Sequence, residues 1–205
     1  LLLLALSVPA WSAWGNGYTY RATVTIDYTQ VGSGNSSNFP LLVNSSLDAT
    51  FKAALKTTGN GGYVTDAQGD DIIFTSDAAG STLLSWELET GSYDATTGAA
   101  LFHVKIPTLS ASANTVIYCF VGNSGVTTFQ GGSLGVAWNS YLGVYHMGNG
   151  SLSLADSSSN ANDLVNTGSV KAYSSGAVGG ASDSSWAGGD TQYTQQYLSS
   201  TSAMG

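Results

Sequence analysis

The stretch YRATVTIDY at residues 20–28 alternates apolar and polar side chains along its whole length. The polar residues fall on one face, and the other face carries Ala22, Val24, Ile26 and Tyr28. This period of two is typical of a strand with one buried side. Similar runs of apolar and β-branched residues between turn residues predict further strands at residues 39–43, 71–76, 83–90, 100–106 and 115–121. Residues 71–76 and 83–90 are predicted to form a hairpin. We therefore predict an all-β fold, an antiparallel, jelly-roll-like β-sandwich.

The composition agrees with this fold class. Only 9% of the 205 residues are charged, against about 25% in an average protein, and Glu occurs only at Glu87 and Glu89. Such a chain cannot cover many helix surfaces, which excludes a helical bundle or a coiled coil. One short helix is predicted at residues 48–56, capped by Asp48. The net charge of -8 argues against nucleic acid and anionic membrane surfaces as partners.

The first thirteen residues, 1–13, are predicted to be part of a secretory signal. A leucine-rich segment precedes small residues that allow cleavage after Ala10 or Ala13. The apolar segment is shorter than the roughly 20 residues that span a bilayer, so we expect no membrane span in the mature chain. No Met or basic segment precedes it, so we expect the natural chain to begin earlier. We predict a secreted or cell-surface protein in which residues 1–13 pack against nothing.

An ordered set of motifs resembles the bacterial and archaeal extracellular family called domain of unknown function 2341. The motifs lie at residues 14–21, 24–26, 38–43, 69–74, 86–89, 102–107 and 117–123. The resemblance covers residues 14–135 and departs from the family where Phe120 and Val121 lack a second Tyr. It implies a secreted or surface-anchored β-sandwich module with no assigned activity, and it carries over no catalytic residue.

Residues 136–205 are more polar and rich in Ser, Gly and Asn. Their motifs at residues 144–147, 156–163 and 179–181 resemble the start of a concanavalin A-like, laminin-G-like jelly roll. That fold needs more strands than the remaining residues supply, so we expect an incomplete second sandwich here. A strand is predicted at residues 141–147.

Few residues could carry catalysis. Glu87 and Glu89 point to one face of a strand, as a glycosidase pair would, but no third acid follows them, and a solvated polar face explains them. The chain offers too few ligands for a zinc site, and His103 is expected to make a surface or inter-strand hydrogen bond. The resemblance to the jelly roll implies a structural role for His146. Cys119 lies in an apolar run and is expected to be buried. We predict that the chain is not a self-sufficient enzyme.

Two loops are candidates for calcium, the only cofactor that the sequence suggests. Asp70 and Asp71 lie in an acidic stretch, and Asp156 and Asn160 lie in a loop with oxygen-bearing side chains at alternate positions. Turn formation explains the same residues equally well.

The aromatic residues are candidates for binding sugars. Flat rings with polar tips suit sugar stacking as well as core packing, and cleavage of the signal leaves Trp14, Trp86, Trp138 and Trp186 in the chain. We expect a non-catalytic recognition or adhesion module that binds a carbohydrate or a matrix polymer. Two alternatives stay open. The chain could be an accessory region of a polysaccharide-degrading enzyme, or a structural spacer in a large surface protein.

Overall fold

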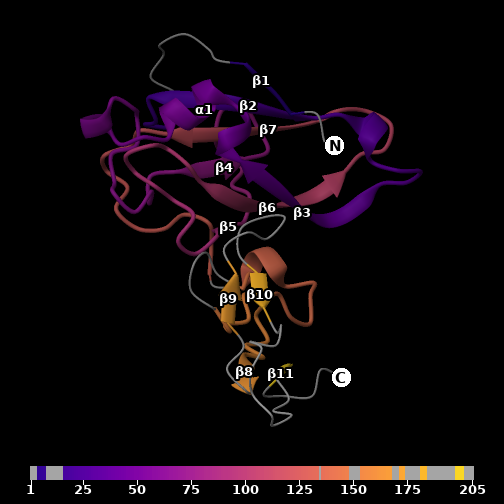
Figure 1. Cartoon of the computed structure of the whole chain (residues 1–205). Coiled ribbons are helices and arrows are strands. Elements are labelled where there is room, and N and C mark those ends of the chain that lie inside the picture. Colours follow the sequence, from indigo (N-terminus) through magenta and orange to yellow (C-terminus); the bar gives the residue numbers. More distant parts are fainter. Residues whose placement is uncertain are drawn as a thin grey trace. The chain divides into compact units, whose positions relative to one another are not determined.

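The computed structural model describes residues 4–7, 16–133, 135–147, 153–167, 171–173, 181–183 and 197–200. The chain divides into two compact units, Leu1–Ser133 and Leu134–Gly205, which are described separately below. Figure 1 shows the strands of both units. Within the described ranges, no helix is long and apolar enough to cross a membrane.

The first unit is an antiparallel β-sandwich, which confirms the predicted fold class. One sheet has the strand order β1-β2-β7-β4, and the other has the order β3-β6-β5. The pairs are nested, because β2 pairs with β7 while β3 pairs with β6, as in a jelly roll. The strands are β1 (Leu4–Ser7), β2 (Tyr20–Ile26), β3 (Ser36–Asn44), β4 (Ile73–Thr75), β5 (Trp86–Leu88), β6 (Leu101–Leu109) and β7 (Thr115–Val121).

Strict alternation fills the space between the sheets. Burial alternates along β2 and along the first part of β6, because a strand sends every second side chain to the same face. Phe74, Trp86 and Phe102 meet edge to face, with ring centroids 5.2–5.6 Å apart. The predicted core is confirmed, with Leu88 partly buried and these residues buried: Val24, Ile26, Leu84, Trp86, Phe102, Val104, Ile106, Ile117, Cys119 and Val121.

The predicted helix is confirmed as α1 (Ala49–Ala54). The Asp48 carboxylate accepts a hydrogen bond from the Phe51 N–H at 2.7 Å and caps the first turn. Phe51 and Leu55 are buried against the sandwich core. Short 3-10 turns form η1 (Tyr28–Gln30), η2 (Ser45–Leu47) and η3 (Thr58–Asn60), and η4 (Val136–Trp138) lies in the second unit.

Two details of the first unit correct the sequence-based expectations. The predicted hairpin exists only as a tight turn with a bridge between Thr75 and Leu83, because β4 and β5 belong to different sheets. The chain crosses the sandwich between them. In addition, the backbone of Leu4–Ser7 pairs with β2, whereas the sequence predicts that residues 1–13 pack against nothing. Both proposed cleavage positions, Ala10 and Ala13, lie outside the described residues.

The second unit has two antiparallel strand pairs. β8 (Leu164–Thr167) pairs with β11 (Tyr197–Ser200), and β9 (Lys171–Tyr173) pairs with β10 (Ala181–Asp183). Residues 141–147 do not form the predicted strand. Side chains hold this segment instead: the Asp156 carboxylate accepts from the Val144 N–H, and the Asn160 amide donates to the Tyr141 carbonyl.

Candidate functional site

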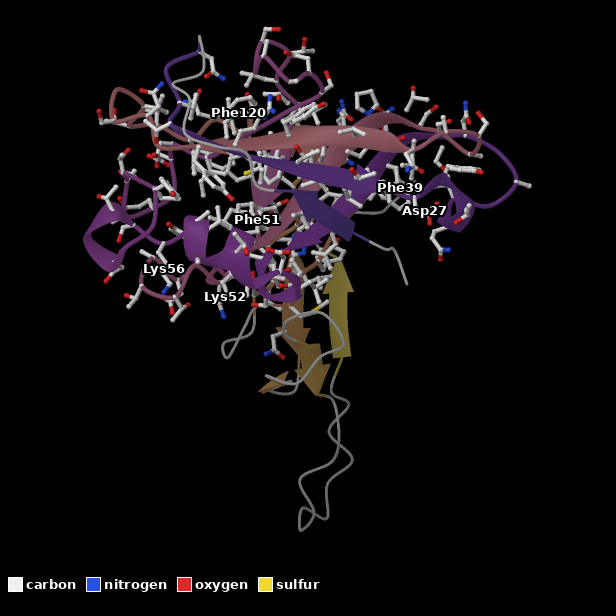
Figure 2. The ribbon with its side chains drawn as sticks, turned by 90° about the horizontal axis from the view of Figure 1, so that it is seen from above. Asp27, Phe39, Phe51, Lys52, Lys56 and Phe120 are labelled. Atoms are coloured by element: carbon white, nitrogen blue, oxygen red, sulfur yellow. The ribbon has the colours of Figure 1, made fainter. Side chains whose placement is uncertain are left out.

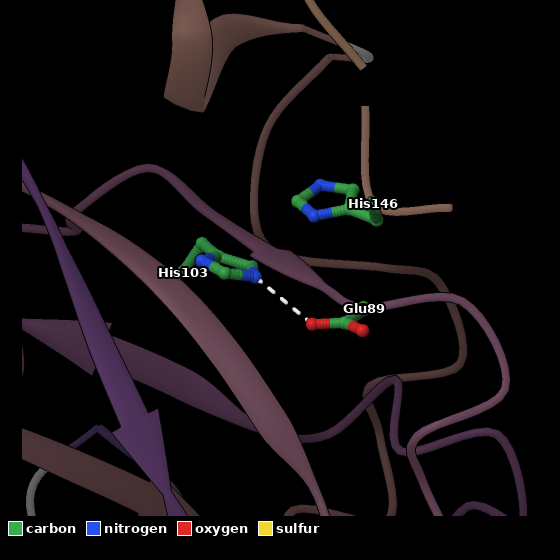
Figure 3. A group of neighbouring side chains, drawn as sticks. All are labelled: Glu89, His103 and His146. Atoms are coloured by element: carbon green, nitrogen blue, oxygen red, sulfur yellow. Dashed lines mark hydrogen bonds and ion pairs between the residues drawn. The ribbon is translucent and has the colours of Figure 1, made fainter. Parts of the chain in front are cut away.

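A buried carboxylate and an imidazole meet on the β3-β6-β5 sheet. Glu89 follows β5 directly, and His103 lies on β6. The Glu89 Oε2 atom lies 3.2 Å from the His103 Nε2 atom, as Figure 3 shows. His103 therefore makes the expected inter-strand hydrogen bond. The prediction that Glu89 lies on a solvated face is wrong, because only 2% of Glu89 is exposed.

This arrangement follows from the pleat of the sheet. The register places Glu87 directly opposite His103, and Glu89 reaches the same imidazole diagonally from two residues further along. A carboxylate that accepts from an imidazole is a structural cross-strand contact, and it is also the orienting unit of many acid–base sites. His146 belongs to the second unit, where its ring centroid lies 5.7 Å from that of Trp138.

The calcium candidates Asp70 and Asp71 lie in a turn that precedes β4. The Asp71 carboxylate is fully buried and accepts hydrogen bonds from the Thr65 N–H at 2.8 Å, the Thr65 hydroxyl at 2.7 Å and the Gly122 N–H at 3.1 Å. Asp70 is partly exposed, and burial, followed by repulsion from Asp66 and Asp71, raises its pKa. The structure thus places Asp71 in a hydrogen-bonded, structural position.

The candidates Asp156 and Asn160 lie in one loop of the second unit. Asp156 Oδ1 accepts from the backbone of Val144 and Ser158, both at 2.8 Å, and Oδ2 accepts from the Ser158 hydroxyl and the Asn162 N–H. Burial alone would raise the pKa of Asp156, but these hydrogen bonds outweigh it and lower the pKa. The Asn160 amide donates to the Tyr141 carbonyl at 2.9 Å. Neither loop is tested for calcium by these contacts, and turn formation stays the alternative explanation of both.

Neither of the two tryptophans that the structure describes is exposed. Trp86 and Trp138 are buried, and Trp14 and Trp186 lie outside the described residues. In the first unit, the exposed rings include Tyr28 at 41%, Phe39 at 37% and Phe129 at 44%. The expectation that Tyr28 continues the buried face of its strand is wrong. β2 ends at Ile26, and Tyr28 begins η1.

Tyr28 follows the end of β2, and Phe39 lies in the first half of β3, so the loop that joins these strands lies between them in the chain. We call this end of the sandwich the aromatic end. It comprises these two rings and the loops at residues 27–35 and 110–114. The loops are joined by a hydrogen bond from the Tyr28 N–H to Asn114 Oδ1 at 3.2 Å and by one from the Ala111 N–H to Asn35 Oδ1 at 2.9 Å. Figure 2 labels Phe39 and Asp27, the residue before Tyr28.

Phe39 is exposed although alternation assigns it to the inner face. It shares that face with Leu41 and Val43, which are buried further along β3. Its cross-strand partner on β6 is Ile106, which is buried in the core cluster. Period-two patterning locates the ring on this face, but it does not show that the ring is exposed.

One comparison with known proteins finds a match. Residues 68–138 match the family described as "Domain of unknown function (DUF2341)". The matched range includes β4 to β7, the Glu89–His103 pair and the Asp70–Asp71 turn, whereas the aromatic residues Tyr28 and Phe39 precede it. No curated protein and no solved structure matches the chain.

Proposed function

We propose that this chain is a non-catalytic, secreted or cell-surface recognition module that binds a glycan at the aromatic end. The observation that supports this proposal is the exposure of Tyr28 and Phe39 at the end where two polar loops are hydrogen-bonded together. Neither ring is needed to complete the buried core, because the buried core cluster includes neither of them.

The chemistry of the aromatic end suits a sugar. The apolar C–H face of a pyranose stacks on an aromatic ring, and sugar hydroxyls exchange hydrogen bonds with amides and hydroxyls. Exposed polar side chains in the two loops include Thr29, Gln30 and Asn114. Because the chain carries a net charge of -8, we expect a neutral glycan rather than an acidic one.

Glycan binding can be tested with single ring deletions. The full chain is applied to a glycan array, and the glycans that bind are measured again with Tyr28→Ala and Phe39→Ala. We expect each variant to lose about five- to thirtyfold in affinity, because a stacked ring contributes about 1–2 kcal/mol. Phe129→Ala is the matched control, because Phe129 is similarly exposed but lies elsewhere. Phe129 contacts Trp86 on edge strand β5, whereas Phe39 is on β3, the other edge strand of the β3-β6-β5 sheet.

The structural-spacer alternative gives a different result on the array. A structural spacer would bind no glycan on the array, or would bind equally well after both ring deletions. An accessory region of a polysaccharide-degrading enzyme would bind the polymer that its enzyme cleaves. Hydrolysis of glucans by the chain itself, lost in Glu87→Gln or Glu89→Gln, would contradict the non-catalytic proposal.

A further inference from the structure

The first strand of the chain closes one edge of the sandwich. β1 pairs antiparallel with β2, so that Leu4 stands opposite Ile26 and Leu6 stands opposite Val24. Both β2 residues are fully buried. The register thus places two leucines of a leucine-rich segment opposite the apolar half of β2. We use the name β2 edge for the side of β2, at residues 23–26, that faces β1.

The other sheet edges are protected by different means. Beside β4, the segment at residues 82–84 bonds through the Leu84 N–H to the Phe74 carbonyl at 2.8 Å. Beside β5, the Trp86 N–H donates to the Gly131 carbonyl at 2.9 Å. Edge strand β3 contains Pro40, which has no N–H to offer a further strand. Each device discourages the addition of another strand.

The β2 edge has no such protection of its own. β2 contains neither proline nor glycine, and within the described part of the chain the strand that pairs with this edge is β1. The sequence predicts that the segment containing β1 is removed on export. Removal would leave the N–H and C=O groups of a regular strand free to pair with another extended segment.

We propose that the β2 edge is a strand-acceptor site. Its occupant is the segment Leu4–Ser7 of this chain, bound in cis while that segment is present and able to bind in trans once the edge is open. The site therefore recognises an extended peptide through a strand ladder that supplies affinity. The apolar residues Val24 and Ile26 stand opposite alternate peptide positions, and they favour leucine there over a charged residue. This inference rests on the β1–β2 pairing and is independent of glycan binding.

The test opens the edge within the full chain. Ala5→Pro combined with Leu6→Pro removes the N–H groups of two adjacent residues, one of which must face β2 in an antiparallel ladder. Within Thr23 to Ile26, we expect the N–H groups that face β1 to exchange hydrogen at least about tenfold faster, while the β7 amides stay protected. A peptide that carries residues 3–8 between lysine pairs should restore the protection in the variant and leave the unmodified chain unchanged.

A matched peptide establishes specificity. The same peptide with aspartate at the positions of Leu4 and Leu6 should restore no protection. If the proline variant loses protection in β7 as well, the measurements are made on a chain with Leu4→Asp and Leu6→Asp, which keeps every backbone N–H. Unchanged exchange at the β2 edge in the variant, or equal restoration by the aspartate peptide, would overturn the proposal.

Discussion

The Oδ2 atom of Asp71 lies 3.1 Å from the backbone nitrogen of Gly122, although 51 positions separate the two residues. This contact ties the turn that precedes β4 to the residue that follows β7. The two partners are closely constrained. Asp71 is fully buried, and Gly122 has a φ of +91° and sits where a Cβ atom would meet the Thr19 hydroxyl.

Removing the Asp71 carboxylate should destabilise the sandwich strongly. Asp71→Ala leaves the N–H groups of Thr65 and Gly122 without their acceptor, so we expect a loss of about 3 kcal/mol in the free energy of unfolding. Denaturant unfolding measures it. Asp70→Ala is the neighbouring control and should cost less than about 1 kcal/mol, because Asp70 is partly exposed. Equal losses in the two variants would show that the buried contact contributes nothing special.

The sequence predicts local structure well where one physical rule decides. Alternation in β2 and β6 identifies the buried face, and Asp48 identifies the start of α1. Asp77 is a residue type that favours a turn, and a turn forms there, but this does not determine which sheet the chain enters next. β4 and β5 therefore lie in different sheets although the turn between them forms as expected.

The candidate site is less predictable, because alternation alone does not determine whether the polar face of a strand is exposed. Alternation puts Glu89 opposite the core side of its strand, which suggests exposure, yet it is buried beside His103. The exposure of Tyr28 depends on where β2 ends, and residue types near the end of a strand do not fix this position. The expected strand at residues 141–147 is absent because side-chain contacts from Asp156 and Asn160 hold its backbone.

Acid should weaken the turn that Asp77 closes. Backbone hydrogen bonds from Ser81 and Thr82 lower the pKa of Asp77 below that of an ordinary aspartate. A lowered pKa in the folded state gives stability that is present above the unfolded pKa of about 3.9 and is lost as the pH falls toward the folded value. The melting temperature of Asp77→Asn should therefore lie below that of the unmodified chain at pH 6, and the gap should narrow below about pH 4. A gap that is constant from pH 6 to pH 2 would contradict this account.

Calcium should give little stabilisation at the Asp156 loop. Both carboxylate oxygens already accept hydrogen bonds of 2.8–2.9 Å, and a calcium ion would have to displace donors that hold the loop. We expect the melting temperature after chelation to stay unchanged on addition of millimolar calcium. A rise that is lost in Asp156→Asn would establish a site there, and a rise lost in Asp70→Asn would place it in the first unit.

The single thiol should report global unfolding. Cys119 is fully buried in the core, and burial raises the pKa of its thiol, so the reactive thiolate is suppressed. We expect a thiol reagent to modify the native chain at least about a thousandfold more slowly than the unfolded chain. The native rate should increase by about a hundredfold in Asp71→Ala, because a loss of about 3 kcal/mol raises the unfolded population by about that factor. Rapid labelling of the native chain would show that β7 opens locally.

The Glu89–His103 pair should be coupled energetically. Glu89→Gln removes the charge from a position that is 2% exposed, and we expect it to destabilise the chain by about 1–3 kcal/mol. Glu87→Gln is the matched control, because Glu87 lies on β5 two residues before Glu89 and is less buried, and it should cost less than about 0.5 kcal/mol. A double-mutant cycle with Glu89→Ala and His103→Ala then isolates the pair, and we expect a coupling energy of about 0.5–2 kcal/mol. Additive losses in the cycle would mean that the 3.2 Å contact does not stabilise the sheet, and that each residue acts through other neighbours.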